Sequence, residues 1–224
     1  MTLSIIMPVL DEAAGIVPAL TALQDYRARG VDVIVADGGS ADNTIDLAQP
    51  LADKVISSPR GRAVQMNAGA ATARGDVLLF LHADTRLPAN AERLVLDGLT
   101  QSNRIWGRFD VQFDSGALRL VAASMNMRSR LTGIATGDQA MFMTRAAFEQ
   151  AGGFPPIALM EDVALSAKLK RLGPPLCLDA RVTTSGQRWR NNGTVRTVLL
   201  MWGLRLRFFF GADPDRLART YGYR

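Results

Sequence analysis

Residues 77–84 read Val-Leu-Leu-Phe-Leu-His-Ala-Asp, an uninterrupted apolar run that ends in polar side chains. The apolar run, residues 77–81, predicts a strand that is buried on both faces, as strands of a parallel sheet are. His82 and Asp84 would then project beyond the carboxyl end of this strand. In open α/β sheets, ligands bind at that edge.

The segments on either side repeat an alternation of strand and helix. In the first half, strands are expected at 3–7, 31–36, 54–57 and 77–81, and helices at 12–29, 42–48, 62–74 and 90–99. In the second half, strands are expected at 105–113, 139–144 and 176–178, and helices at 118–131, 145–151 and 161–172. This rhythm predicts an α/β fold with a doubly wound, mostly parallel sheet and helices on both faces.

Three polar segments follow three of these strands. They are residues 8–12, 37–40 and 82–84. Because the carboxyl ends of parallel strands share one edge, we expect them to form one site. Asp84 suits a hard divalent cation that bridges two phosphates, Asp37 a ribose or base, and Arg62 a phosphate. Taken singly, each residue is better explained as a turn residue or helix cap, and it is their joint occurrence after consecutive strands that favours a site.

Glu161 and Asp162 begin a predicted helix and allow two interpretations. First-turn acids stabilise a helix through its dipole by about 0.3–1 kcal/mol each. A carboxylate in a site can instead act as a general base that takes the proton of an attacking hydroxyl. The residues alone leave both open.

The combined motifs resemble glycosyltransferase family 2, whose members have the GT-A fold. The match covers about residues 3–172, and it is closest to a short bacterial subgroup with Leu-His-Ala-Asp-Thr at 81–85. The motifs are residues 4–12 (Ser-Ile-Ile-Met-Pro-Val-Leu-Asp-Glu), 35–40 (Val-Ala-Asp-Gly-Gly-Ser), 81–84 (Leu-His-Ala-Asp), 137–139 (Gly-Asp-Gln) and 161–162 (Glu-Asp).

The resemblance implies inverting transfer of a sugar from a nucleoside-diphosphate sugar to an acceptor hydroxyl. It assigns nucleotide binding to Pro8, Leu10, Glu12, Asp37, Arg62 and Asp84, and sugar binding near Gly137, Asp138 and Gln139. It makes Asp162 the general base, with Glu161 beside it. It also implies Mg²⁺ or Mn²⁺ at Asp84, the metal-binding end of the family's DxD motif.

One position departs from the family pattern. The first residue of the DxD motif is His82, the one histidine of the chain, which does not supply the charge of a carboxylate. This departure keeps a second hypothesis open, a non-catalytic module that binds a nucleotide sugar or a membrane surface. A sugar-phosphate nucleotidyltransferase is a weaker alternative, because the loop at 8–12 is acidic and lacks glycine.

The positive charge of the chain is concentrated at its C-terminal end. Residues 1–180 carry 17 basic and 19 acidic side chains, whereas residues 181–224 carry nine arginines and two aspartates. A basic segment favours an anionic partner. No nucleic-acid-binding module is recognisable, so we expect no nucleic acid partner. Arg188 and Trp189 can close over a diphosphate or sugar through pairing and stacking.

The basic segment also contains an apolar helix, expected at residues 195–210. Its apolar stripe consists of Val195, Val198, Leu199, Trp202, Leu206 and Phe209. Arg196, Arg205 and Arg207 interrupt the run, which is too short and too charged to span a bilayer. Packing on the domain, contact with a membrane surface and a homodimer interface all remain open. We divide the chain into a domain at 1–190 and a helical extension at 191–224.

Composition sets the remaining expectations. Apolar residues make up 48% of the 224, enough for a substantial core. The single cysteine, Cys177, excludes an internal disulfide and suits a buried thiol. The first residues lack the pattern of a signal peptide, so we expect a cytoplasmic protein, with a place at the inner face of the membrane left open. A membrane contact would suit a lipid or lipid-linked acceptor.

Overall fold

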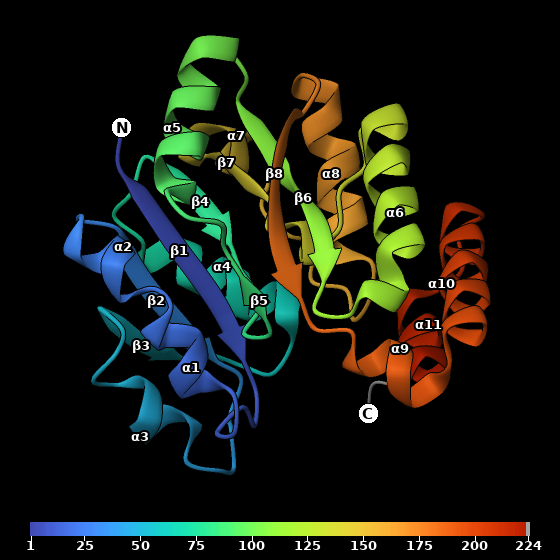
Figure 1. Ribbon diagram of the computed structural model, residues 1–224, viewed down its shortest axis with the longest axis horizontal. Coiled ribbons are helices and arrows are strands. Elements are labelled where there is room, and N and C mark those ends of the chain that lie inside the picture. The colour runs from blue at the N-terminus through green and yellow to red at the C-terminus, as the bar shows by residue number, and fades with distance from the viewer. Residues whose placement is uncertain (223–224) are drawn as a thin grey trace.

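The computed structural model describes residues 1–222, in which one sheet of eight strands forms the centre (Figure 1). The strands are β1 (Leu3–Val9), β2 (Asp32–Asp37), β3 (Lys54–Ser57), β4 (Val77–Phe80), β5 (Thr85–Arg86), β6 (Trp106–Phe113), β7 (Phe142–Thr144) and β8 (Leu176–Thr184). Their order is β3-β2-β1-β4-β7-β6-β8-β5. β1, β2, β3 and β4 are mutually parallel, as are β6 and β8, while β7 and β5 pair antiparallel to their neighbours.

Helices cover both faces of this sheet. They are α1 (Ile16–Thr21), α2 (Gln24–Ala28), α3 (Thr44–Ala48), α4 (Arg62–Thr72), α5 (Ala91–Ser102), α6 (Arg119–Thr132), α7 (Arg145–Gln150), α8 (Glu161–Leu172), α9 (Gln187–Asn192), α10 (Thr194–Phe209) and α11 (Pro214–Tyr221). The predicted α/β architecture, a mostly parallel sheet with helices on both faces, is therefore confirmed.

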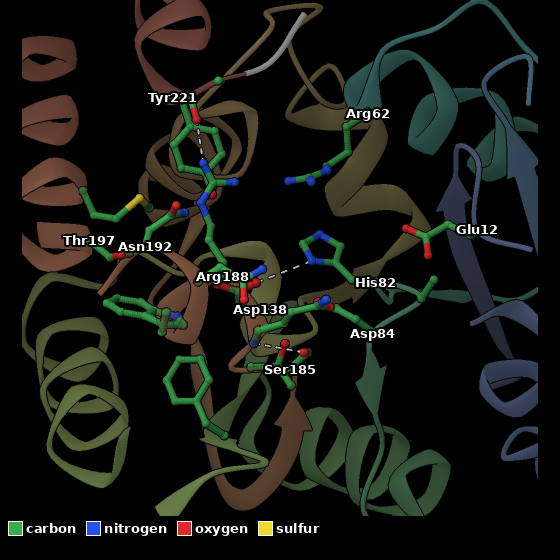
Figure 2. Close-up of a pocket in the computed structure, with 18 of the residues that line it drawn as sticks. Glu12, Arg62, His82, Asp84, Asp138, Ser185, Arg188, Asn192, Thr197 and Tyr221 are labelled. Atoms are coloured by element: carbon green, nitrogen blue, oxygen red, sulfur yellow. Dashed lines mark hydrogen bonds and ion pairs between the residues drawn. The ribbon is translucent and has the colours of Figure 1, made fainter. Parts of the chain in front are cut away.

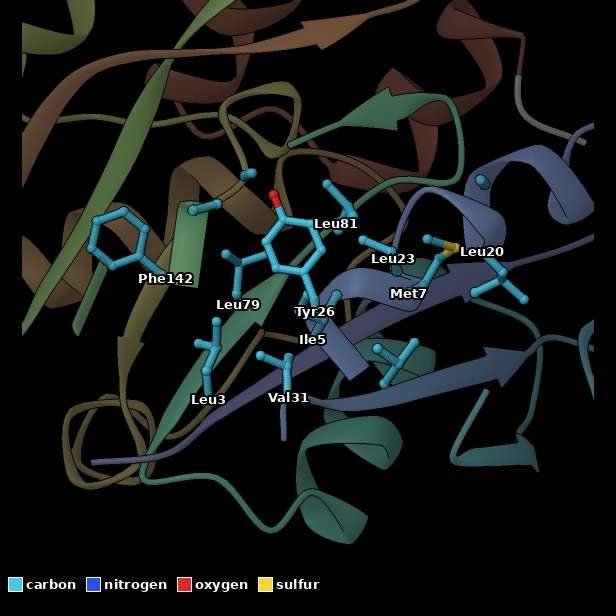
Figure 3. Packing of buried hydrophobic residues seen from close by; sticks show 14 of the residues in the cluster. Leu3, Ile5, Met7, Leu20, Leu23, Tyr26, Val31, Leu79, Leu81 and Phe142 are labelled. Atoms are coloured by element: carbon cyan, nitrogen blue, oxygen red, sulfur yellow. The ribbon is translucent and has the colours of Figure 1, made fainter. Parts of the chain in front are cut away.

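Successive residues of the central strands point to opposite faces, which divides the core into two clusters. Ile5 and Met7 of β1 pack with Leu20 and Tyr26 of α1 and α2 (Figure 3). Ile6, between them in sequence, packs on the other side with residues of α4, α7 and α8. Because β1 is buried on both faces, its sequence is apolar without alternation.

Two predicted elements differ from the structure near the site. The helix expected at 12–29 is two short helices, and the first begins only at Ile16. Its beginning is delayed because the backbone N–H groups of Glu12 and Ala13 donate to the side chains of Thr44 and Asp42. The strand expected at 139–144 is shorter, because residues 137–139 form a 3₁₀ turn and only 142–144 pair with the sheet.

The C-terminal part holds more structure than we predicted. β8 continues to Thr184, well past residue 178, because it pairs along most of β6 and then with β5. Two helices that the sequence analysis did not predict, α9 and α11, flank the expected helix α10. Leu204 and Leu217 of α10 and α11 are buried against Leu159 and Met160.

The predicted apolar stripe of α10 is not the face that packs. Trp202 and Phe209 are exposed by 66% and 82%, whereas Thr197 and Leu204, on another face, are buried. A helix that is apolar on several faces does not reveal from its sequence which face meets the protein. No helix in residues 1–222 is both long and apolar enough to cross a lipid bilayer.

Candidate active site

A cavity of about 680 Å³ opens where β1 and β4 end (Figure 2). Glu12, Arg62, His82 and Asp84 lie on one side of it, and Arg188, Asn192, Thr197 and Tyr221 on the other. The second wall comes from α9, α10 and α11. The cavity therefore joins the sheet edge that the sequence predicted as a site to the C-terminal helices.

The loop after β1 is held by the loop after β2. The Asp11 N–H donates to Ser40 Oγ at 2.9 Å, and the Ala41 N–H donates to Asp11 Oδ1 at 2.8 Å. Asp11 itself adopts the left-handed backbone region, with φ of 52°. Glu12 is thereby turned into the cavity, where burial and the negative charges of Asp84 and Asp42 raise its pKa.

Asp37 lies at the end of β2, as expected, but its side chain faces none of the cavities described here; it stabilises the turn that follows the strand. Its Oδ2 accepts the N–H groups of Gly39 and Ser40 at 2.8 and 3.0 Å, and its Oδ1 accepts the Ser40 hydroxyl. The residue is buried and is not among the residues lining the cavities described here. Leu10 lines a neighbouring cavity of about 480 Å³, which shares Pro8, Glu12 and Arg62 with the larger one.

His82 and Asp84 follow β4 in a tight turn closed by the Thr85 N–H, which donates to the His82 carbonyl. Asp84 is exposed at the cavity wall. His82 is mostly buried, and its Nδ1 lies 3.5 Å from Asp138 Oδ1. Burial raises the pKa of Asp138, but His82, Arg62 and Arg205 outweigh this effect, so the pKa lies below its usual value.

Glu161 and Asp162 start α8 at the edge of a smaller cavity of about 70 Å³, which adjoins the large one. Asp162 Oδ2 accepts the Gly137 N–H at 2.7 Å, so the 3₁₀ turn at 137–139 is fixed to α8. Glu161 is 4% exposed and lies 3.7 Å from Arg62. Burial, together with repulsion from Asp162, raises its pKa to about 7.

Arg188 and Trp189 both line the large cavity, and both are held by other parts of the chain. The Arg188 guanidinium stacks on the ring of Tyr221 at 3.5 Å and donates to the Tyr221 carbonyl. Trp189 contacts Phe113 edge to face, with ring centroids 5.7 Å apart. Tyr221 and Phe113 are distant in sequence, so no local signal pointed to them.

Comparison with known proteins identifies the family. The family model "Glycosyl transferase family 2" matches residues 4–150, more than half of the chain. The chain belongs to this family. Family 2 membership, which the motifs predicted, is thereby confirmed. No curated protein sequence matches the chain.

Solved structures of other proteins share the fold at low sequence identity. TarS residues 1–349 from S. aureus superpose with a TM-score of 0.69 at 18% identity, over 83% of this chain and 61% of that one. The same protein has been solved in complex with UDP-GlcNAc. A second match is glucosyl-3-phosphoglycerate synthase from Mycobacterium tuberculosis, solved in complex with Mn²⁺, UDP and glucosyl-3-phosphoglycerate. Its TM-score is 0.58 at 18% identity, over 82% of this chain and 70% of that one. The sheet and its helices are therefore those of a GT-A fold.

This family 2 chain spans about three fifths of the TarS structure that it matches. Its predicted site residues fall into two groups. Those that line the described cavities are Pro8, Leu10, Glu12, Arg62, Asp84, Gly137, Asp138, Glu161, Asp162, Arg188 and Trp189. Asp37 and Gln139 do not. Gln139 is fully buried, and its side chain faces Thr136 and Asn126 because the 3₁₀ turn directs it inward.

The carboxylates would suit a cation that takes most of its ligands from phosphates and water. Within residues 1–222, no cluster of three or more His, Cys, Asp or Glu side chains could enclose a metal ion. Mg²⁺ commonly uses only one or two carboxylates and completes its shell with phosphates and water. Asp84 is exposed on the cavity wall. After burial, its negative charge is the largest cause of the raised pKa of Glu12, which lines the same cavity. His82 faces Asp138 instead.

Proposed function

We propose that this family 2 protein is an inverting glycosyltransferase that moves a sugar from a nucleoside-diphosphate sugar to an acceptor hydroxyl. The observation that carries the proposal is the adjacency of two cavities with different chemistry. The larger holds Arg62, which suits a diphosphate, and Asp84, which suits the divalent cation bound to it. The smaller holds Asp162, which suits a reacting hydroxyl. Arg62, His82 and Asp138 border both.

In the larger cavity, two arginines would bind the diphosphate, and a carboxylate would bind the cation that accompanies it. The planar guanidinium groups of Arg62 and Arg188 can each pair with phosphate oxygens. Asp84 would hold Mg²⁺ or Mn²⁺, which when bound stabilises the negative charge that develops on the departing diphosphate. The base and ribose would extend toward Pro8 and Leu10 in the neighbouring cavity.

In the smaller cavity, Asp162 would act as the general base. It takes the proton of the acceptor hydroxyl while the hydroxyl oxygen attacks the anomeric carbon on the face opposite the diphosphate. The bond from that carbon to the diphosphate oxygen breaks, and the configuration inverts. The hydrogen bond from the Gly137 N–H fixes one oxygen of Asp162 and orients the carboxylate. Glu161, whose pKa is about 7, lies beside it and pairs with Arg62.

Calorimetric titration with a panel of nucleoside diphosphates, with and without Mn²⁺, tests the donor site. We expect one diphosphate to bind in a metal-dependent way and Asp84→Ala to weaken it by at least about tenfold. Asp97→Ala, at an exposed position of α5, is the matched control and should change nothing. Absence of binding by every diphosphate would contradict the proposal.

Asp162→Asn tests the general base separately. The amide oxygen of Asn can still accept the Gly137 N–H, and only the local bond from the Val163 N–H to Asp162 Oδ1 is lost, so we expect diphosphate affinity within about twofold of wild type. Sugar transfer should fall by about 10²–10⁴-fold. Metal-dependent binding without turnover of any donor in the wild-type protein would favour the non-catalytic binding module instead.

We also propose that α10 contacts an anionic membrane surface. Its exposed apolar residues are Val195, Leu199, Trp202, Leu206 and Phe209. They are spaced by four and three residues and so share one face. Arg196 and Arg207 are exposed on the same helix, which has no acidic residue. Apolar side chains flanked by arginine suit the interface of a bilayer with anionic lipids. A lipid or lipid-linked acceptor would match such a contact.

A further inference from the structure

Two arginines, one of which lines the small cavity, have buried nitrogen atoms without partners. They are Arg128 on α6 and Arg205 on α10. Within residues 1–222, Nε of both residues and Nη2 of Arg128 are shielded from solvent and make no hydrogen bond. A buried donor left unsatisfied costs about 1–3 kcal/mol, and more when it is charged. These atoms therefore call for a physical explanation.

Other arginines that the fold buries have protein partners. The fully buried Arg108 pairs with Asp110 and donates to the Asn126 carbonyl, although its Nε, like that of Arg188, has no partner in the described part of the chain. Arg145 donates to the carbonyls of Ala70, Ala73 and Gly75. The fold thus provides acceptors for buried guanidinium groups elsewhere. Arg128 and Arg205 differ, because within residues 1–222 neither makes a hydrogen bond or an ion pair through any of its guanidinium nitrogens.

Arg205 lies beside the cavity of the proposed general base, and electrostatic interactions link Arg128 to both Arg205 and Asp162. Arg205 lines the cavity of about 70 Å³ together with Asp162, Gly137 and Asp138. Burial lowers the pKa of Arg128 to about 10, repulsion from Arg205 adds to this effect, and Asp162 opposes it. The three charges therefore lie close together. Both arginines keep their protons at neutral pH and form a cationic pair.

The neighbouring acids do not neutralise this pair by direct contact. Asp138 lies against His82, and Asp162 accepts the Gly137 N–H. In the described part of the chain, neither acid comes within 4.0 Å of the guanidinium nitrogens of Arg128 or Arg205. A planar guanidinium matches the oxygens of a phosphate or carboxylate, and two of them suit one oxyanion.

We propose that Arg128 and Arg205 bind an anionic group of the acceptor, a phosphate or another oxyanion, while an acceptor hydroxyl faces Asp162. This inference rests on the proposed function, because it takes the small cavity as the acceptor side. The oxyanion would belong either to a soluble phosphate ester or to the phosphate of a lipid. The acceptor class is thus narrowed to hydroxyl compounds that carry a negative charge.

Titration with inorganic phosphate tests this site. The protein is first saturated with the nucleoside diphosphate and Mg²⁺, so that phosphate cannot occupy the diphosphate site. Arg128→Gln and Arg205→Gln should each weaken phosphate binding by at least about tenfold. Diphosphate affinity should stay within about twofold in both variants. Arg93→Gln, at an exposed position of α5, is the matched control for the lost charge.

Two further measurements separate binding from folding. Removing a desolvated charge without a partner should leave the Tm of Arg205→Gln unchanged or raise it. Arg205→Lys keeps the charge but loses the planar fork, so its phosphate affinity should lie between wild type and Arg205→Gln. Unchanged phosphate binding in both Gln variants would overturn the proposal. So would the absence of phosphate binding in a wild-type protein that binds diphosphate.

The source of the oxyanion is decided by comparing two probes. Glycerol 3-phosphate is titrated in solution, and phosphatidylcholine vesicles are compared with and without phosphatidic acid. Binding that requires Arg205 supports the proposal with either probe. Binding of glycerol 3-phosphate would indicate a soluble acceptor, and binding of vesicles that contain phosphatidic acid would indicate a lipid acceptor. If diphosphate itself fails to bind, the proposed function fails, and phosphate titration of the free protein still decides whether Arg128 and Arg205 form an anion site.

Discussion

At the scale of single residues, the site depends on how closely Gly137 packs against His82. A Cβ at position 137 would lie 2.5 Å from Cε1 and Nε2 of the His82 ring. The backbone of Gly137 is not left-handed, so the requirement for glycine here is steric. The close approach lets the Gly137 N–H reach Asp162 and brings Asp138 to His82.

Gly137→Ala should therefore destabilise the protein by about 1–3 kcal/mol, as overpacking does. Urea unfolding measures the change. Adding His82→Ala removes the ring and should recover most of the loss. Gly116→Ala is the control, because no atom lies within 4 Å of its Cβ position. Equal effects of the two glycine substitutions would contradict this account.

Glu161 should make stability depend on pH. Burial and repulsion from Asp162 raise its pKa from 4.5 to about 7, so the folded chain binds this proton more tightly than the unfolded chain. The free energy of unfolding should therefore fall as the pH rises from 4.5 to about 7. Glu161→Gln should be more stable than wild type by up to about 3 kcal/mol near pH 8, and by little near pH 4.

Thermal unfolding across this pH range measures the effect. Glu149→Gln, at an exposed position of α7, is the matched control and should show no such difference. If the stability of Glu161→Gln depended on pH as the wild type does, burial of the Glu161 carboxylate would not be the cause of the pH dependence.

At the scale of elements, α10 has two faces with different partners. Leu204 packs in the cluster with Leu159 and Leu217, whereas Trp202 and Phe209 face outward. The helix also carries Arg205 to the small cavity. One helix would thus join a membrane-facing surface to the acceptor side of the site.

Trp202→Ser should reduce binding to vesicles that contain phosphatidylglycerol by about tenfold, because it removes a large interfacial side chain. Co-sedimentation measures the binding. Leu94→Ser, on α5, is the control for loss of an exposed apolar residue. Absence of wild-type binding would exclude the membrane contact. A sedimentation coefficient of the free protein that changes with Trp202→Ser would indicate a dimer interface instead.

At the scale of the whole molecule, the large cavity is assembled from both ends of the chain. Glu12 and Asp84 come from the first half of the sheet, and Arg188 and Tyr221 from the C-terminal helices. A ligand that contacts both walls stabilises their association through mass action.

Binding of the diphosphate with Mn²⁺ should therefore slow amide hydrogen exchange in α9 and α11, far along the chain from the loops proposed to hold the phosphates. Mass spectrometry of peptides covering 187–221 measures this protection. Asp84→Ala, which lacks the proposed metal-binding carboxylate, should abolish it. Protection confined to residues 8–12 and 82–86 would mean that the C-terminal wall does not contact the ligand.

Local patterns in the sequence determined the layered fold and the edge where the cavity lies. The apolar runs of β1 and β4 specify doubly buried strands, and polar residues that follow parallel strands must share one edge. Their positions in the predicted fold already pointed to Arg62 and Asp84, and the family resemblance added Glu12 as a nucleotide-binding residue and Asp162 as the general base; all four line the described cavities. These features depend on neighbours along the chain, so the sequence expresses them directly.

Contacts between distant segments decided the rest. Asp37 and Gln139 stand in family motifs, yet their side chains hold turns, because hydrogen bonds available only in the fold direct them there. Arg205 interrupts an apolar helix in the sequence, and only the packing of α10 against Met160 brings it to the cavity that Asp162 also lines. Which face of α10 is buried, and therefore which arginine reaches the site, is a property of tertiary packing, because the helix is apolar on more than one side.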